Sequence, residues 1–407
     1  MRNNTFKYSI SDRGQWYSII IKTNFRYIEI RDSLKLLPFS LKAIGKSFKT
    51  KHQKLDMEYK GFRYAGCEIT PEEERYLKND VLVLKEALEF MYSQGHDKLT
   101  IGSCCLAEFK GFYTKKKYAE LFPDLTAIEI DKNEFGRGSA DLYIRRSYKG
   151  GWCYLVPKKA GKIFKKGLTA DVNLTTAPRL YPSMMVDNKF PVGLPTFWKG
   201  NEIPAEAMAE NKYYFVRIKT RFYIKDGYLP FIQIKGNWLY KATECLTTSD
   251  VYNPKTGKHS RFYIDVDGET KDSFVILTLT MTDYVLFREH YNVEDFEILD
   301  GCYFEAKEGL FDEYIAKYKK IKMESVGALR ALAKLFLNNL YGQMARNDDS
   351  SFKVAFLDDT GAVNFMPVQA NEKKPGFIAI GSAITSYARN FTIRAAQANY
   401  HGPDKPG

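Results

Sequence analysis

The sequence of 407 residues predicts an α+β fold, a mixed α/β protein with two or three domains. Three observations predict it. Residues 15–30 are rich in β-branched and aromatic side chains, as strands are. A longer β-rich region follows at residues 212–305. Helical spacing of apolar residues dominates residues 70–93, 308–344 and 382–400.

The first elements are a pair of strands and a helix with clear end signals. Two strands are expected to pair within residues 15–30. In the helix expected over residues 70–93, Thr70 is the N-cap, Pro71 suits the first helical position, and Glu73 completes a capping box. The expected apolar stripe consists of Leu77, Val81, Leu84, Leu88 and Met91.

The remaining elements follow from the spacing of apolar, Gly and Pro residues. Short strands between loops are expected over residues 143–200, and a mostly β region over 212–305 contains a short helix near 283–290. A single long helix is expected over 308–344, a hairpin-like insert over 347–375, and a final helix over 382–400. Residues 401–407 read as a turn that leads into an absent strand, so both ends are expected to be cut from a longer protein.

The composition favours a polyanionic partner. The chain has 61 Lys and Arg against 49 Asp and Glu, a net charge of +12, which suits nucleic acid, although basic enzymes without that partner are about as common. Its six cysteines form no C-x-x-C pair, which indicates a reducing compartment and no structural zinc. The longest apolar stretch, residues 273–281, is too short for a bilayer, and no signal peptide is recognisable. We expect a cytoplasmic protein without a membrane partner.

The clearest chemistry lies on the helix expected over residues 308–344. Arg330, Lys334, Asn338 and Tyr341 share one face, and Gly342 leaves room for a base beside the tyrosine. The apolar stripe of the same helix is expected to be Leu329, Leu332, Phe336 and Leu340. Two cations one turn apart suit a nucleoside triphosphate. Spacing alone favours the alternative of a solvated amphipathic face with Tyr341 in the core.

The identities of the residues on this helix, unlike their spacing, favour the nucleotide-binding interpretation. Residues 334–342 read K-L-F-L-N-N-L-Y-G, which closely resembles the K-x-x-x-N-S-x-Y-G signature of the fingers helix in family B DNA polymerases. The similarity is greatest to the protein-primed branch of small tailed phages and linear plasmids. The resemblance implies that Lys334 contacts the incoming triphosphate and Tyr341 the nascent base pair. It also implies that Arg330 and Lys322 are supporting phosphate contacts and that Asn338 lines the dNTP site.

The resemblance further implies a metal-binding carboxylate followed by Tyr-Pro. Asp171, at an expected strand end, fits the first metal ligand, and Tyr181 fits the residue that excludes a 2′-hydroxyl. Such enzymes use two Mg²⁺ or Mn²⁺ ions per site. Residues 174–179 stand where the family has a single serine, so Tyr181 is expected to be displaced from Asp171. This insertion indicates a tolerated loop, a sequence error or lost activity.

A second metal-binding aspartate, in a Y-x-D-T-D-S motif, is implied after the helix ending near Tyr400, and the sequence reaches Gly407 without it. Two segments imitate that motif. Residues 263–268 precede the fingers helix, and residues 358–360 lie in the expected hairpin. Both are expected to be turn carboxylates, because Asp and Gly at loop tips satisfy local backbone donors.

The N-terminal third resembles part of the family's proofreading 3′–5′ exonuclease. Tyr76 and Asp80 match its Y-x-x-x-D motif, in which the aspartate binds metal, although such a pair is usually only a surface contact. Residues 32–39, including Ser33 and Leu34, resemble the single-strand-binding segment, and Lys54 and Tyr59 would touch the frayed primer end. The family's D-x-E and N-x-x-x-D carboxylate motifs have no counterpart, so only part of an exonuclease site is expected.

Tyr148, Gly150 and Gly151 match the Y-x-G-G linker that contacts template DNA in the family. The neighbouring cations Arg145, Arg146 and Lys149 fit a phosphate-contacting loop, and an ordinary β-turn is the alternative. Two further blocks correspond to inserts of the protein-primed branch: residues 188–309, which dock the terminal protein, and residues 346–381, which confer processivity and strand displacement.

The resemblance therefore implies a DNA-directed DNA polymerase fragment that uses primer-template DNA, dNTPs and a priming terminal protein, and that is expected to be a monomer. The implied domains are a partial RNase H-like exonuclease (1–100), linker and first part of the palm (101–187), docking insert (188–309), fingers (310–345), hairpin insert (346–381) and second part of the palm (382–407). The chain is expected to bind DNA in a salt-sensitive manner and to incorporate no nucleotide. A non-catalytic DNA-binding remnant and a basic nucleic-acid-binding protein of other ancestry are the alternatives.

Overall fold

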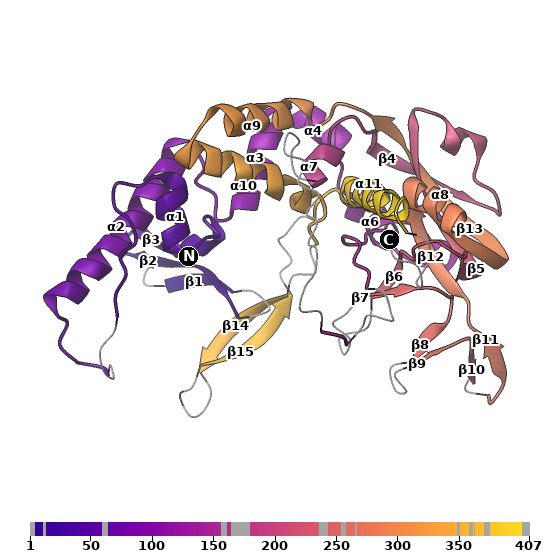
Figure 1. The fold of residues 1–407 in the computed structure, drawn as a ribbon, viewed down its shortest axis with the longest axis horizontal. Coiled ribbons are helices and arrows are strands. Elements are labelled where there is room, and N and C mark those ends of the chain that lie inside the picture. The colour runs from indigo at the N-terminus through magenta and orange to yellow at the C-terminus, as the bar shows by residue number, and fades with distance from the viewer. Residues whose placement is uncertain are drawn as a thin grey trace. The chain divides into compact units, whose positions relative to one another are not determined.

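The computed structural model of the chain shows a mixed α/β protein (Figure 1). It describes residues 5–10, 14–58, 64–155, 161–163, 180–235, 243–253, 258–264, 267–347, 351–357, 361, 363–369 and 375–400. The chain divides into two compact units. Unit 1 comprises residues 1–114, 313–343 and 347–374, and unit 2 comprises residues 115–312, 344–346 and 375–407.

Unit 1 begins with a three-stranded antiparallel sheet. Its strands are β1 (Thr5–Ile10), β2 (Trp16–Thr23) and β3 (Arg26–Arg31), in the order β1-β2-β3. The predicted pairing within residues 15–30 is therefore confirmed, and β1 is an addition that the sequence pattern did not indicate. A short 3₁₀ turn, η1 (Ser33–Lys35), and α1 (Leu41–Phe48) follow.

The long helix α2 (Pro71–Ser93) forms as predicted, with Thr70 and Glu73 making both hydrogen bonds of a capping box. Its predicted apolar stripe is wrong in the first half, since the side chains of Leu77 and Val81 are 50% and 66% exposed. The helix packs on α1 through its second half, where Val83, Ala87 and Met91 are buried.

Residues 308–344 contain two helices, which corrects the single helix predicted there. These are α9 (Asp312–Glu324) and α10 (Gly327–Met344). Gly327 has a φ of +61°, a left-handed conformation that ends helical continuity and that glycine adopts without strain. On α10, Leu332, Phe336 and Leu340 are buried as predicted, but Leu329 is exposed.

Two further parts complete unit 1. Helix α3 (Ile101–Gly111) was not indicated by the sequence pattern. The predicted hairpin is present as β14 (Ser351–Leu357) paired antiparallel with β15 (Val363–Gln369), and β14 contacts β1.

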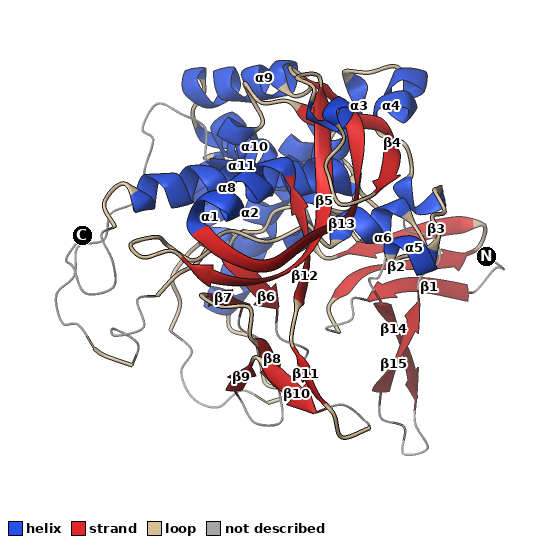
Figure 2. Ribbon diagram, turned by 90° about the vertical axis from the view of Figure 1, so that its right-hand side faces the viewer, coloured by secondary structure: helices blue, strands red, loops and turns tan. Residues whose placement is uncertain are grey.

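Unit 2 is built on a four-stranded antiparallel sheet in the order β12-β5-β13-β4 (Figure 2). The strands are β4 (Phe190–Lys199), β5 (Lys212–Ile224), β12 (Val275–Thr280) and β13 (Tyr291–Lys307). Helices α8 (Met281–His290) and α11 (Ile378–Gln397) contact this sheet and each other. Phe222 of β5, Phe287 of α8 and Tyr291 of β13 pack together in the core, with ring centroids 5.1–5.5 Å apart.

The remainder of unit 2 consists of short elements. The helices are α4 (Lys115–Leu121), η2 (Leu125–Ala127), α5 (Lys132–Phe135), α6 (Ala140–Arg145), α7 (Leu180–Met184) and η4 (Ala205–Met208). The hairpins are β6 (Ile232–Lys235) with β7 (Thr243–Leu246), β8 (Val251–Asn253) with β9 (Lys258–Ser260), and β10 (Phe262–Ile264) with β11 (Thr270–Asp272).

The short strands predicted over residues 143–200 are mostly wrong, because the described part of this segment contains α6, α7 and only one strand, β4. Ser139 caps α6 by accepting a hydrogen bond from the backbone of Leu142, a start signal that was overlooked. Among the described helices, none is long and apolar enough to cross a bilayer.

Candidate nucleic-acid and nucleotide sites

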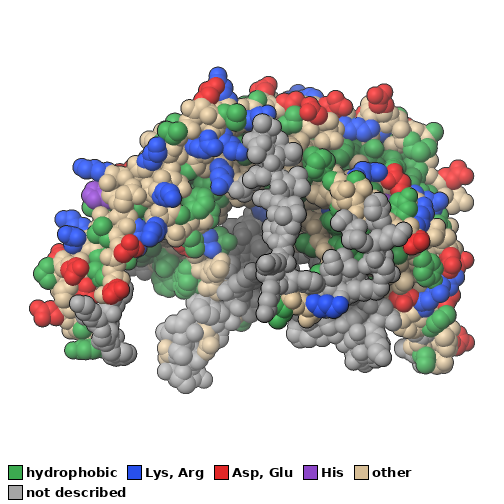
Figure 3. All heavy atoms as spheres, viewed as in Figure 1, with side chains coloured by type: hydrophobic (Ala, Val, Ile, Leu, Met, Phe, Trp, Pro, Cys, Tyr) green, Lys and Arg blue, Asp and Glu red, His purple; other side chains and the backbone are tan. Residues whose placement is uncertain are grey.

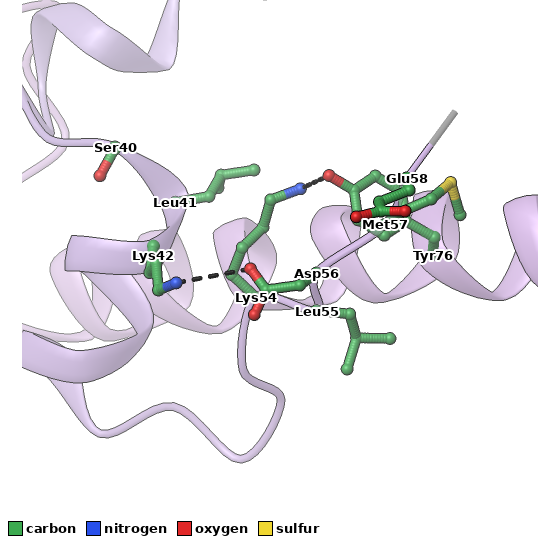
Figure 4. Close-up of a pocket in the computed structure, with 9 residues that line it drawn as sticks. All are labelled: Ser40, Leu41, Lys42, Lys54, Leu55, Asp56, Met57, Glu58 and Tyr76. Atoms are coloured by element: carbon green, nitrogen blue, oxygen red, sulfur yellow. Dashed lines mark hydrogen bonds and ion pairs between the residues drawn. The ribbon is translucent and has the colours of Figure 1, made fainter. Parts of the chain in front are cut away.

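Lys54, Tyr76 and Asp80 lie together in unit 1, although the lysine is far from the other two in sequence. Figure 4 shows the contact between Lys54 and Tyr76. Tyr76 and Asp80 are one helical turn apart on α2, so their side chains share a face. The Lys54 ammonium donates to the Tyr76 hydroxyl and to Oδ2 of Asp80, and lies 3.8 Å from the centre of the Tyr76 ring. The three side chains form one polar group.

The surroundings of Lys54 favour its charged form. Partial burial of Lys54 opposes its charge, but hydrogen bonds to Asp80 and Tyr76 outweigh it and raise the pKa of Lys54 above its ordinary value of 10.5. The side chains of Lys54 and Asp80 are 20% and 18% exposed. Oδ1 of Asp80 is buried and has no hydrogen-bond partner among the described residues, which suits a carboxylate oxygen that accepts a cation.

A pocket of about 410 Å³ opens beside Lys54 and Tyr76 (Figure 4). Its lining comprises Ser40, Leu41, Lys42, Lys54, Leu55, Asp56, Met57, Glu58 and Tyr76. Lys42 pairs with Asp56 at 3.4 Å, and both side chains are largely exposed. Sequence reasoning missed Lys42. Lys42 lies in the first turn of α1, where a cation is electrostatically unfavourable. This unusual position is the sequence signal that could have identified Lys42.

The neighbouring single-strand-binding candidates form an exposed turn. Asp32 caps η1 by accepting a hydrogen bond from the backbone of Leu34 at 3.0 Å, and the Leu34 side chain is exposed. Ser33 begins this turn and lines a second pocket, which also contains Arg31 and Tyr92. Tyr59 lies outside the described residues.

On α10, the two predicted phosphate contacts Arg330 and Lys334 are exposed, while Asn338 and Tyr341 are half-buried. In Figure 3, Lys and Arg side chains are visible over the part of unit 1 that contains α9 and α10. Arg330 donates to the backbone carbonyl of Lys322 at 2.8 Å, which joins α10 to the last turn of α9. Asn338 donates to the carbonyl of Lys334 at 2.7 Å.

The space around Gly342, which follows Tyr341 at the end of this row on α10, is open. A Cβ atom added at Gly342 would meet no atom within 4 Å, so no packing within the described protein requires glycine there. The row of Arg330, Lys334, Asn338 and Tyr341 therefore presents two cations and a partly exposed aromatic side chain along one helix.

The residues predicted to belong to the palm are only partly described. Asp171 and the inserted residues 174–179 lie outside the described residues, whereas Tyr181 lies on α7 in unit 2. A Cβ atom at Gly151 would lie 3.3 Å from the Tyr181 hydroxyl, so the linker runs directly beside this tyrosine. Burial, and secondarily the nearby Tyr181 hydroxyl, raise the pKa of Tyr148, while the Arg389 cation opposes the rise.

The cations of the linker differ in availability. Arg145 donates to both carboxylate oxygens of Asp141 and to the carbonyls of Ala345 and Arg346. These hydrogen bonds stabilise unit 2 internally, and the contact of Arg145 with a phosphate stays a prediction. Arg146 is exposed.

Among the described residues, no three His, Cys, Asp or Glu side chains gather into a metal-binding group. In residues 263–268, Tyr263 and Ile264 belong to β10, and Gly268, with a φ of +82°, lies before β11. Asp265 lies outside the described residues. Residues 358–360 lie outside the described residues.

The sequence matches the family described as DNA polymerase type B, organellar and viral, over residues 1–66 and 64–406. The chain belongs to this family. It is 38% identical over 402 residues to the DNA polymerase of Bacillus phage Nf, a match that covers 98% of this chain and 63% of the relative. The DNA polymerase of Bacillus phage phi29 is 37% identical over 402 residues, again with 98% and 63% coverage.

A more distant type B relative is the DNA polymerase of Streptococcus phage Cp-1, 31% identical over 399 residues, with 97% of this chain and 63% of the relative covered. The chain thus spans 63% of the length of each of these relatives, a little less than two-thirds.

Solved structures agree with the family assignment. The orthorhombic crystal form of phi29 DNA polymerase matches with a TM-score of 0.77 and 34% identity, covering 98% of this chain and 64% of that chain. Phi29 DNA polymerase complexed with primer-template DNA matches with the same TM-score and 33% identity, at 98% and 63% coverage. The predicted resemblance to the protein-primed type B polymerases is confirmed.

Proposed function

We propose that this chain contributes the nucleotide-binding and primer-binding surfaces of a protein-primed DNA-directed DNA polymerase that replicates viral or plasmid DNA. The observation that carries the proposal is the exposed row of Arg330 and Lys334, continued by Asn338 and Tyr341, on α10 of a type B polymerase chain. Phi29 polymerase, a relative of this chain, has been solved with primer-template DNA and incoming nucleotides.

In this proposal, the cations bind the triphosphate of the incoming dNTP. Lys334 is exposed and makes no ion pair within the described part of the chain, so its ammonium is available to a phosphate. Arg330, joined to Lys322 at the end of α9, supports the same triphosphate, and Asn338 lines the site. Tyr341 stacks on the nascent base pair, and Tyr181 excludes ribonucleotides by contact with the sugar.

Two Mg²⁺ or Mn²⁺ ions would activate the primer hydroxyl and stabilise the leaving pyrophosphate. Asp171 would contribute a carboxylate to them, and Asp80 would bind metal in the exonuclease region. The buried Oδ1 of Asp80, which has no partner among the described residues, supports the second assignment.

We assign the pocket beside Lys54 and Tyr76 to the frayed 3′ end of the primer. Lys54 would bind a phosphate and orient Tyr76 and Asp80, to which it is already hydrogen-bonded. Ser33 and Leu34, in an exposed turn, and Tyr59 would hold the unpaired strand.

The remaining assignments follow the family order. Tyr148, Gly150 and Gly151 contact DNA, residues 188–309 dock a terminal protein, and the β14–β15 hairpin in residues 346–381 surrounds the downstream template. The working form is a monomer in the host cytoplasm. The assigned roles are exonuclease for residues 1–100, first part of the palm for 101–187, fingers for 310–345 and second part of the palm for 382–407.

A second candidate function is that of a non-catalytic DNA-binding remnant of such a polymerase. The sequence itself favours it at one point, where residues 174–179 separate Asp171 from Tyr181. Nucleotide binding distinguishes the two, because the chain by itself is expected to incorporate no nucleotide. Binding of a dNTP to the chain–primer-template complex supports the polymerase, and DNA binding without dNTP binding supports the remnant. Primer extension with Mg²⁺ or Mn²⁺ that Asp171→Ala abolishes would contradict the remnant and the expectation of no incorporation.

Nucleotide binding tests the role of α10. Lys334→Ala should weaken dNTP binding to the chain–primer-template complex about tenfold or more, because a charge-assisted contact to phosphate is lost. Titration with a fluorescent dNTP analogue measures this. Lys319→Ala on α9 is the matched control, since Lys319 is also an exposed helical lysine and is not assigned to the site.

The melting temperature should be the same in both variants, because neither side chain is buried. Equal nucleotide affinity of the wild type and Lys334→Ala would contradict the assignment of α10 as the triphosphate site.

A further inference from the structure

Helix α11 carries a buried polar seam along one side. Ser382, Ser386 and Arg389 follow one another at i, i+4 and i+7, and all three side chains are buried. Ser382 hydrogen-bonds to Ser147 at 2.6 Å, and Ser386 to Thr280 at 2.6 Å. Polar side chains in such a core need partners, and these partners come from the segment just after α6, from the end of β12 and from the linker.

Arg389 is the charged member of this seam, and its burial requires the most hydrogen-bond partners. Its side chain is 2% exposed and pairs with Asp283 of α8, which is 3% exposed. The pair joins α11 to α8, which lie beside each other in unit 2 (Figure 1). A buried guanidinium is costly unless its donors are used, so its remaining contacts are informative.

Those contacts are with the backbone of the linker. Nη1 of Arg389 donates to the carbonyl of Lys149 at 2.6 Å and to the carbonyl of Gly150 at 3.1 Å. Just beyond these residues, the Trp152 indole donates to the carbonyl of Pro230 at 3.0 Å. The linker is thus anchored on both sides of Gly151, the residue that runs beside the Tyr181 hydroxyl.

We propose that Arg389, oriented by Asp283, is a positioning residue that holds the Tyr148–Gly151 linker against Tyr181. One guanidinium provides donors to the carboxylate and to both carbonyls, a geometry that lysine cannot reproduce. The pair thereby fixes the path of the loop next to the residue assigned to the sugar of the incoming nucleotide. The claim that this loop meets DNA rests on the proposed function, whereas the claim that Arg389 fixes the loop does not.

The test separates folding from positioning. Removing Arg389 alone leaves a buried, unpaired carboxylate and risks unfolding, so the informative variant is Asp283→Leu with Arg389→Met. It keeps apolar packing between α8 and α11 but removes both hydrogen bonds from Arg389 to the linker. The matched control is Glu289→Gln with Arg394→Gln, which removes an exposed ion pair, 2.8 Å long, between the same two helices.

Hydrogen exchange of peptides covering residues 146–155 measures the linker in the chain without DNA. Exchange should be about tenfold faster in Asp283→Leu/Arg389→Met and unchanged in the control, because a fixed loop opens less often. In the single variant Arg389→Lys, the melting temperature should stay near that of the wild type, whereas exchange of the linker should still be faster than in the wild type. Rescue of slow exchange by lysine, or unchanged exchange in the double variant, would overturn the inference.

Primer-template affinity, from fluorescence anisotropy, separates this inference from the proposed function. A released linker should weaken DNA binding about tenfold in the double variant and leave the control unaffected. Faster exchange with unchanged DNA affinity would refute the DNA part of the inference while Arg389 still fixes the loop. Absence of DNA binding by the wild-type chain would instead refute the proposed function and leave the exchange result standing.

Discussion

Individual residues show how sequence spacing and structure contribute differently to the site. Tyr76 and Asp80 were expected to lie together because one helical turn separates them. Lys54 joins them from 22 and 26 residues away, a proximity that the family resemblance implied and spacing alone could not predict. The Asp283–Arg389 pair, 106 residues apart, had no signal in the sequence, since an Asp and an Arg on amphipathic helices normally indicate solvated faces.

Gly342 provides a prediction at the scale of one residue. It lies in α10 with open space around it, so Gly342→Ala should stabilise the fold by up to about 1 kcal/mol through helix propensity. If a base pair must approach Tyr341 closely, the added methyl group should nevertheless weaken dNTP binding. Thermal denaturation and nucleotide titration of the same variant measure the two effects.

Gly111→Ala is the control, since it is also in a helix of unit 1 and has open space around it. It should change stability in the same direction and leave nucleotide binding intact. A Gly342→Ala protein with wild-type nucleotide affinity would remove the argument that this glycine serves the ligand.

At the scale of elements, local signals predicted some helices and failed for others. The capping box located α2 correctly, because Thr70 and Glu73 satisfy the first backbone donors themselves. The break between α9 and α10 was missed, since Gly327 fits a continuous helical pattern and only its left-handed conformation reveals the end. The buried face of α2 was misplaced because the amphipathic pattern does not reveal which half of a helix meets a neighbour.

The sheet of unit 2 contains a glycine that packing requires. A Cβ atom at Gly301, on β13, would overlap the Trp198 ring of β4 and lie 2.5 Å from the carbonyl oxygen of Phe215 on β5. Gly301→Ala should therefore lower the free energy of unfolding by about 1–3 kcal/mol, as overpacking does. Chemical denaturation measures the loss.

Gly138→Ala is the control for this substitution, because Gly138 also lies in unit 2 and has no atom within 4 Å of the added methyl group. Its unfolding free energy should stay within about 0.5 kcal/mol of the wild type. Equal stability of the two variants would mean that the sheet adjusts to the added atom.

At the scale of the whole molecule, the sequence indicated the family better than it indicated geometry. The net charge of +12 suggested a polyanion, but it does not distinguish available cations from those used internally. Arg330 and Lys334 are exposed, whereas Arg145 is bound to Asp141 and to two carbonyls. Such pairing depends on tertiary contacts, which the order of residues alone does not reveal.

Salt dependence tests this distribution of charge. The affinity for primer-template DNA should fall steeply as salt rises, and Arg146→Gln should reduce the slope of log Kd against log salt by about one, because one phosphate contact is lost. Lys219→Gln is the control, since Lys219 already faces Glu297 and the Phe274 ring. A salt-independent affinity would contradict binding through phosphates.

The apolar side chains left open in unit 1 have a consequence for handling the protein. Leu77 and Val81 on α2, and Tyr27, Ile28 and Ile30 on β3, are all at least half exposed. Apolar surface of this kind attracts amphiphiles and other copies of the same chain. Mild detergent and low protein concentration should therefore extend the shelf life of purified samples, and hydrophobic-interaction resins should retain the chain strongly.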